Sequence, residues 1–131
     1  MNRAFVLPPL EAVMDAYHRE MAITGGAKGL RNEEGLRSAL DRASNKLAYH
    51  ESNPDVHDLA AALAFGVSRN HPFIDGNKRM AFIVTFMTLR MNGWYLDSSE
   101  NGATTAILEL AEGIQDEDGF ANWLRQWSYQ I

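Results

Sequence analysis

An almost unbroken apolar run constrains the fold more than any other feature of this chain. The run reads Met80-Ala81-Phe82-Ile83-Val84-Thr85-Phe86-Met87-Thr88-Leu89. As a helix it would be apolar on nearly every side, so it is expected to be buried at the centre of the domain. The β-branched stretch Ile83-Val84-Thr85 makes a buried strand the alternative. The length of the run favours a helix from about Asn77 to Asn92, with Asn92-Gly93 as its stop.

The first turn of this helix carries two cations, Lys78 and Arg79. The helix dipole is positive there, and each uncompensated cation costs roughly 0.3–1 kcal/mol. Solvated surface charge is one interpretation, because so small a penalty is easily tolerated. The other is that an anion binds beside the free backbone N–H groups and offsets both charges. His71 and Asp75 lie just before this turn, which favours an enzyme site for a phosphate-bearing ligand.

The residues that precede these cations suggest roles in catalysis. His71 is the candidate general base, since histidine titrates near neutral pH, although it could instead only hydrogen-bond within a loop. Asp75 is the candidate magnesium ligand, because Mg²⁺ takes one or two carboxylates and fills its shell with water and phosphate oxygens. Asp75-Gly76 also fits an ordinary turn, and Asn77 fits the N-cap of the helix. Both alternatives are compatible with a phosphate cradle made of backbone N–H groups.

Five other segments show helical periodicity. Their expected buried faces are Leu10, Val13, Met14, Tyr17 and Met21; Leu36, Leu40, Ala43 and Leu47; Val56, Leu59, Ala60, Leu63 and Val67; Ala106, Ile107, Leu110, Ala111 and Ile114; and Phe120, Trp123, Leu124 and Trp127. The predicted N-caps are Asn32, Asp55 and Asp118. Segments 3–7 and 94–96 are expected to be extended. We therefore predict a single all-α domain over residues 1–131, with about six helices around a buried central helix.

Composition restricts the class of protein. The 131 residues include 46% apolar residues, which is ordinary for a globular domain. Twelve basic and seventeen acidic residues give a net charge of −5, which argues against a general nucleic-acid or membrane-surface binder. The absence of cysteine excludes disulfides and thiol chemistry. The apolar stretch at the N-terminus is too short for a signal peptide core, and the run after Arg79 is too short for a membrane span, so we expect a soluble, cytoplasmic protein.

The stretch His71-Pro72-Phe73-Ile74-Asp75-Gly76-Asn77-Lys78-Arg79 resembles the signature of the Fic/Doc family, H-x-F-x-(D/E)-G-N-G-R-x-x-R. Six of the eight fixed positions agree. Lys78 replaces a glycine, and Phe82 replaces the second arginine. Asn-Lys-Arg at this place is similar instead to the death-on-curing (Doc) toxins of the family. Gly25-Gly26-x-x-Gly-Leu-Arg-Asn and Leu89-Arg90-Met91-Asn92-Gly93 extend the resemblance over most of the chain.

The resemblance implies a Fic-type fold and the transfer of the γ-phosphate of ATP to a threonine of elongation factor Tu, which stops translation. It implies that His71 activates the target hydroxyl and that Asp75 holds Mg²⁺. The phosphate ligands it implies are Gly76, Asn77, Lys78 and Arg79. Two alternatives remain open: a Fic-type nucleotidyl-transferase, which Lys78 and Phe82 oppose, and a non-catalytic binding module that kept the fold.

Partners and control also follow from the resemblance. The glycine-rich loop Thr24–Arg31 is either a flexible connector or, by resemblance, a flap that docks the target strand. Members of the family are often restrained by a helix carrying (S/T)-x-x-x-E-(G/N). Leucine precedes each candidate glutamate, Glu34, Glu100 and Glu112, by four positions, so that pattern does not occur in this chain. The resemblance therefore implies a Phd-like antitoxin acting in trans, through a helix docked on an apolar surface.

Overall fold

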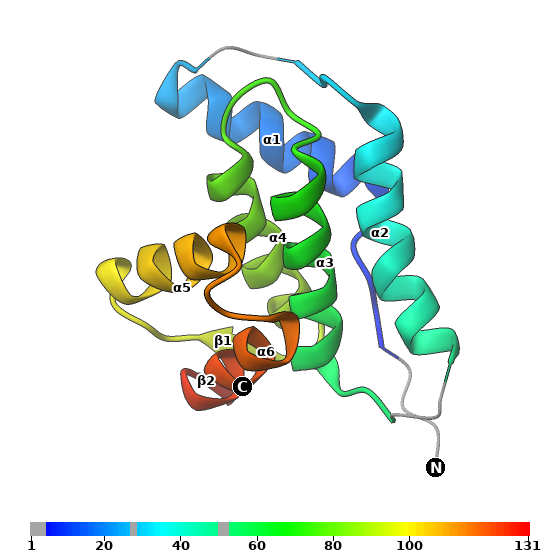
Figure 1. Cartoon of the computed structure of the whole chain (residues 1–131), viewed down its shortest axis with the longest axis vertical. Coiled ribbons are helices and arrows are strands. Elements are labelled where there is room, and N and C mark those ends of the chain that lie inside the picture. Colours follow the sequence, from blue (N-terminus) through cyan, green and yellow to red (C-terminus); the bar gives the residue numbers. More distant parts are fainter. Residues whose placement is uncertain (1–4, 27–28, 50–52) are drawn as a thin grey trace.

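The computed structural model describes residues 5–26, 29–49 and 53–131. This part of the chain forms six helices and one short sheet (Figure 1). The elements are α1 (Leu10–Thr24), α2 (Glu33–Ala48), α3 (Val56–Asn70), α4 (Asn77–Met91), β1 (Trp94–Leu96), α5 (Glu100–Glu112), α6 (Glu117–Gln126) and β2 (Ser128–Gln130). The all-α prediction is confirmed, and so is the helical assignment of the apolar run. No helix in the described ranges is long and apolar enough to cross a membrane.

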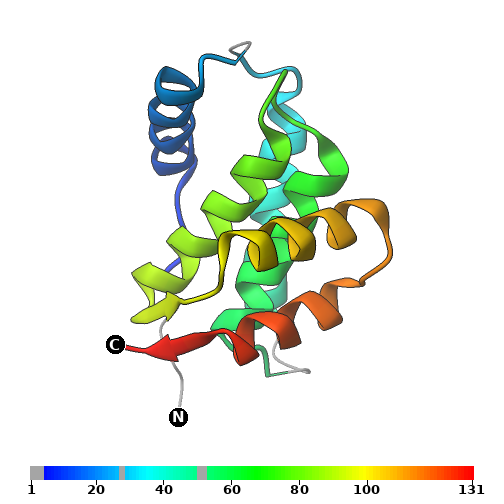
Figure 2. The same cartoon turned by 90° about the vertical axis from the view of Figure 1, so that its left-hand side faces the viewer.

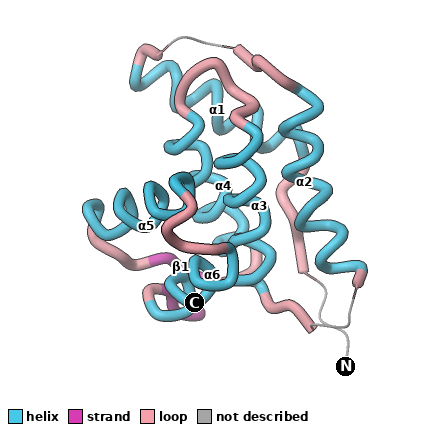
Figure 3. The backbone as a smooth tube through the Cα atoms, in the orientation of Figure 1, coloured by secondary structure: helices cyan, strands magenta, loops and turns pink. Residues whose placement is uncertain are grey.

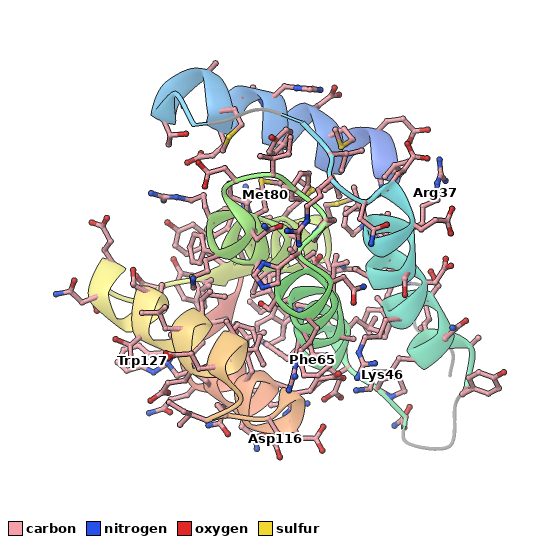
Figure 4. The ribbon with its side chains drawn as sticks, turned by 45° about the horizontal axis from the view of Figure 1, so that its top comes forward. Arg37, Lys46, Phe65, Met80, Asp116 and Trp127 are labelled. Carbon is pink, nitrogen blue, oxygen red and sulfur yellow. The ribbon has the colours of Figure 1, made fainter. Side chains whose placement is uncertain are left out.

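The helices α3 and α4 form the centre of the molecule. Helix α2 packs on one side of them, α5 and α6 lie on the other, and α1 crosses one end (Figure 1). Seen from the side, α4 separates α1 from α5 and α6 (Figure 2). Figure 4 shows Met80 of α4 near the middle of the molecule, whereas Arg37 and Asp116 lie at its edge. The core therefore follows α3 and the inner face of α4.

The prediction that α4 would be buried all round is wrong. Six of its fifteen residues are buried, against eleven of the fifteen in α3. The half-buried side of α4 consists of Phe82, Ile83, Phe86 and Met87. The alanine-rich sequence of α3 explains the difference, because small side chains let neighbouring helices approach it from several sides. Helix α4 leaves an apolar surface only partly covered.

Helices α2 and α3 approach each other closely at Gly66. A Cβ atom there would lie 2.7 Å from both Cα and Cβ of Ala39, one of which is backbone. Helix α2 would have to move away to make room for it. Gly66 is therefore required by packing.

We expect Gly66→Ala to lower the free energy of unfolding by about 1–3 kcal/mol through overpacking. The sign is informative, because glycine to alanine in an uncrowded helix is stabilising by up to about 1 kcal/mol. Chemical denaturation of the single and double variants measures the effect. Ala39→Gly should restore part of the stability in the double variant, since it removes one of the two contacts. A stabilised Gly66→Ala variant would contradict this packing.

Two of the predicted N-caps agree with the structure, and a third is displaced. Asn32 and Asp55 are N-caps as predicted, and their side chains accept hydrogen bonds from Gly35 N and Asp58 N. Helix α6 begins two residues earlier than predicted, with Asp116 as its N-cap in place of Asp118. Helix α5 ends at Glu112 and is capped by Gly113, a residue with positive φ, so Ile114 lies outside the helix and is 72% exposed. Its predicted place on the buried face is wrong.

Two short extended segments close the fold near the end of α4. The prediction of an extended stretch at 94–96 is confirmed, and β2, which was not predicted, pairs with it antiparallel with Tyr95 opposite Tyr129. The predicted segment 3–7 lies partly outside the described residues. In its described part, Val6 exchanges hydrogen bonds with the side chain of Asn92. Asn92, the C-cap of α4, thus also holds the amino-terminal segment in place.

A partly exposed charge cluster with one buried histidine links the start of α3 to α6 and β2. The Asp55 side chain accepts two hydrogen bonds from Arg125 at 3.0 Å, and His57 bonds to Ser128 at 2.8 Å. Burial lowers the pKa of His57, although the nearby Asp55 carboxylate acts in the opposite direction. Burial would raise the pKa of Asp55, but the hydrogen bonds from Arg125 and from the Asp58 backbone hold it well below its usual range. The fold therefore favours a neutral His57 and an ionised Asp55.

Both shifts predict that the protein is less stable in acid. The stabilisation from a neutral His57 is complete above its unfolded pKa of about 6.5 and is lost as the pH falls below that value. The contribution of Asp55 is lost below about pH 4, the range of an unperturbed aspartate. Denaturation at a series of pH values should show both steps. His57→Gln should remove the first step, and a pH-independent stability between about 7 and 5 in the wild type would contradict the assignment.

Candidate active site

The connection from α3 to α4 carries the predicted site and lies against the connection from α1 to α2. Both connections occupy the same end of the molecule (Figure 3). Arg31 N and Asn32 N donate to Pro72 O at 2.8 and 3.0 Å, and Ile74 N donates to Gly29 O at 3.0 Å. Leu30 and Phe73 form an antiparallel bridge between the same two stretches. The described end of the predicted flap is therefore paired with the motif backbone; residues 27 and 28 lie outside the described part.

Phe73 anchors this loop in the core. Its side chain is fully buried and stacks on Tyr17 of α1 with ring centroids 4.3 Å apart. The Tyr17 hydroxyl accepts from Gly29 N at 2.7 Å and lies 3.3 Å from Gly29 O. The Asn77 side chain bonds to both N and O of Phe73, at 3.0 and 2.9 Å. One buried ring and two polar side chains thus fix both stretches of backbone.

His71 ends α3 in a left-handed conformation, with φ 46° and ψ 56°. Such a conformation is uncommon for a residue other than glycine and costs on the order of 1–3 kcal/mol. Its N–H donates to Val67 O, and its carbonyl accepts from Arg31 Nη2 at 3.1 Å. The imidazole is exposed, and no hydrogen bond to it is found in the described structure. The backbone is held while the side chain stays accessible.

The amino-terminal end of α4 presents an anion-binding geometry. Gly76 is the N-cap, with φ 83°, so the predicted N-cap at Asn77 is one residue too late. Asn77 is the first helical residue, and its side chain supports the loop instead of capping the helix. The first helical hydrogen bond runs from Met80 N to Gly76 O at 2.8 Å. The three N–H groups before Met80 therefore have no partner within the helix and can bind an anion.

The two cations of this turn have different surroundings. Arg79 Nε lies 3.2 Å from Glu20 Oε1 of α1. Lys78 is exposed and forms no ion pair with any residue that the structure describes. Glu20 thus offsets one charge at the positive end of the helix, and the other is left to a ligand or to solvent.

A groove of about 460 Å³ opens beside these cations, between α4 and the start of α5. Lys78 and Arg79 contribute its polar part at the motif. Phe82, Leu96 and Ile107 contribute apolar surface farther along. The position of Phe82 means that apolar surface occupies the place of the second arginine in the broad Fic signature. A ligand with both a charged and an apolar part suits such a groove.

Asp75 is the only carboxylate of the motif loop. It is exposed, and its Oδ1 accepts from Gly76 N at 2.8 Å. Among the described residues, no group of three or more His, Asp or Glu side chains could hold a metal ion. Mg²⁺ sites in proteins often use one or two carboxylates and fill the remaining positions with water and phosphate oxygens.

Glu20, Tyr17 and Arg31 were not predicted as site residues. Each contacts the motif from a helix or loop distant in sequence, and no local pattern marks those contacts. The groove residues of α5 were missed for the same reason. Tyr17 was correctly placed on the buried face of the first helix, but its hydroxyl bond to Gly29 has no signal in the sequence. His57 has a structural contact, since it hydrogen-bonds to Ser128.

Comparison with known proteins places this site in a family. The family model described as "Fic/DOC family" matches residues 9–89. This range includes α1, α2, α3, the motif loop and most of α4. The chain belongs to the Fic/DOC family. It is similar to Toxin Doc of Mycolicibacterium smegmatis, with 32% identity over 99 residues that cover 74% of this chain and 76% of that protein.

A solved structure is also similar. It is the crystal structure of the BepC protein, a VirB-translocated Bartonella effector protein, from Bartonella tribocorum with bound AMPPNP. The TM-score is 0.49 and the sequence identity is 16%. The match covers 73% of this chain and 49% of the BepC chain, so this chain spans about half the length of that protein.

Proposed function

We propose that this protein is a Doc-like toxin that transfers the γ-phosphate of ATP to a hydroxyl of a protein target and thereby inhibits translation. The observation that carries the proposal is the amino-terminal turn of α4, where Lys78 is exposed and forms no ion pair within the described structure, with the exposed His71 at the start of the loop that leads into this turn. The similarity to Toxin Doc supports the toxin function. By the same family resemblance, the target is elongation factor Tu.

The roles of the motif residues follow from their positions. The γ-phosphate would bind the N–H groups at the start of α4, where the helix dipole and Lys78 stabilise its charge. Arg79 would add a planar fork of donors, which matches phosphate oxygens. His71 would accept the proton of the target hydroxyl while that oxygen attacks the γ-phosphorus and ADP leaves. Asn77 would contribute its free backbone N–H, and Gly76, whose own N–H is engaged by Asp75, would contribute the left-handed turn that aims these donors at the phosphate.

Magnesium fits this site through Asp75. Its Oδ1 is engaged by Gly76 N–H, and its Oδ2 accepts no hydrogen bond from the described residues. A single exposed carboxylate suits a cation that keeps several waters and binds phosphate oxygens. When bound, Mg²⁺ would neutralise charge on the β- and γ-phosphates. Asp75 would hold it at the mouth of the site.

Nucleotidyl transfer is the second candidate, and one observation favours it. Gly76 keeps the glycine of the Fic signature at a positive φ, where any other residue would be strained. Lys78 and Phe82 oppose it, because they replace a glycine and an arginine of that signature. Phosphate transfer therefore fits the first turns of α4 better.

The toxin proposal also includes a partner, a Phd-like antitoxin acting in trans. The half-buried apolar side of α4 and the groove towards α5 offer a surface for an amphipathic helix. Such a helix would cover the phosphate site together with the apolar surface. The proposed place of action is the cytoplasm, where ATP and elongation factor Tu occur.

Induced expression in a bacterial host tests the proposal. We expect growth to stop, with incorporation of a labelled amino acid falling before synthesis of RNA or DNA. A Lys78→Ala variant, which removes only an exposed side chain, should fold normally and relieve the arrest. Normal growth and protein synthesis in cells that accumulate folded wild-type protein would rule the toxin function out.

A further inference from the structure

Glu20 of α1 touches the proposed phosphate ligand Arg79 from a distant part of the sequence. Its Oε1 lies 3.2 Å from Arg79 Nε. The Glu20 side chain is only 17% exposed, whereas that of Arg79 is 55% exposed. The carboxylate is thus enclosed by the protein, and the guanidinium reaches outward from it.

The point of contact leaves the binding end of the arginine free. The ion pair is made through Nε, and the terminal nitrogens form no hydrogen bond within the part of the chain that the structure describes. An arginine binds phosphate most strongly through a planar pair of N–H groups. A carboxylate beside Nε restrains the guanidinium and leaves Nη1 and Nη2 for the ligand.

Helix α1 holds Glu20 at a defined place over the motif. Tyr17 and Met21, which lie three residues before and one residue after Glu20, are both buried. Tyr17 stacks on Phe73, and a Cβ on Gly76 would lie 2.8 Å from Met21 Cε. The face of α1 that carries Glu20 is therefore in register with the motif loop. An ion pair on so fixed a scaffold loses little freedom when it forms.

We propose that Glu20 is a positioning residue that orients Arg79 for the phosphates of the nucleotide. The proposal rests on the proposed function of the same site. Without Glu20, Arg79 would start from many orientations and bind phosphate less well. Glu20→Ala is expected to raise the KM for ATP about tenfold, the loss typical of one charge-assisted contact, with little change in kcat.

Four variants separate positioning from simple packing: E20A, E20Q, R79A and the double variant E20A/R79A. E20Q keeps the shape of the side chain and an oxygen near Nε but removes the charge, so its KM should lie between those of wild type and E20A. In the R79A background, E20A should have no further effect on KM. E11Q, on an exposed residue of the same helix, is the matched control and should behave as wild type. Thermal unfolding shows whether each variant is folded.

The measurements are the kinetics of phosphate transfer from ATP and the affinity for ATP by calorimetry. An E20A variant with unchanged or lower KM and unchanged affinity would overturn the positioning role, as would an equal effect of E20A with and without Arg79. If E20A does not fold, the KM and ATP affinity of E20Q decide whether Glu20 has the positioning role, since glutamine preserves the shape of the side chain. If the wild type transfers label and the Glu20 variants have the same KM and affinity for ATP, only the positioning proposal is refuted. A wild type that neither binds nor uses ATP refutes the proposed function as well.

Discussion

Replacement of His71 by alanine is expected to reduce phosphate transfer about 10²- to 10⁴-fold, the range for loss of a general base. The imidazole is exposed and makes no hydrogen bond in the described structure, so its removal takes nothing from the core. The free energy of unfolding should therefore change by no more than about 0.5 kcal/mol. Rates of transfer to the target and denaturation curves of both proteins measure the two quantities.

The control for this prediction is His18→Ala. His18 is exposed on α1, and its removal should leave both rate and stability unchanged. In cells, His71→Ala should abolish growth arrest while His18→Ala should not. Retained growth arrest in a folded His71→Ala variant would contradict catalysis by His71 and favour the binding-module alternative.

Phe73→Ala is expected to have the largest effect on stability. The side chain is fully buried and stacks on Tyr17, so its truncation should lower the free energy of unfolding by about 3–5 kcal/mol. That is a large share of the roughly 5–15 kcal/mol that stabilises a typical domain. The loop that carries His71 and Asp75 would lose its anchor at the same time. Denaturation measures the first effect, and hydrogen exchange of the loop measures the second.

Ile74→Ala is the matched control for Phe73. The two residues are neighbours in the same loop, but Ile74 is 53% exposed. Its truncation should cost much less than that of Phe73. Equal losses for the two variants would mean that the loop is not anchored by the buried ring.

Much of the fold could be predicted because its signals are local. Helix periodicity and the caps at Asn32 and Asp55 depend on residues a few positions apart. The full burial predicted for α4 failed because exposure depends on which other helices cover it. The alanines of α3 let that helix become the most buried one, although the run in α4 is more apolar. Likewise, β2 formed because β1 offered it an edge, and short polar strands carry little signal of their own.

The candidate site likewise has a part that could be predicted from local sequence and a part that could not. His71, Asp75 and Lys78 are close in sequence, so any loop entering a helix brings them together. The contacts that hold them come from elsewhere: Arg31 bonds to the carbonyl of His71, and Glu20 pairs with Arg79. Such contacts depend on how α1 packs over the motif, and a single sequence does not specify that. The cations at the positive end of α4 were the one local anomaly that pointed to the site.

The central claim is that the amino-terminal turn of α4 directs transfer of the γ-phosphate. Incubation of the purified protein with a cell extract, or with elongation factor Tu, and ATP labelled on either the α- or the γ-phosphate tests it most directly. We predict that a target protein becomes labelled from γ-labelled ATP only, and that the His71→Ala protein transfers no label. Transfer of the α-label to a protein would contradict the account and assign nucleotidyl transfer to this site.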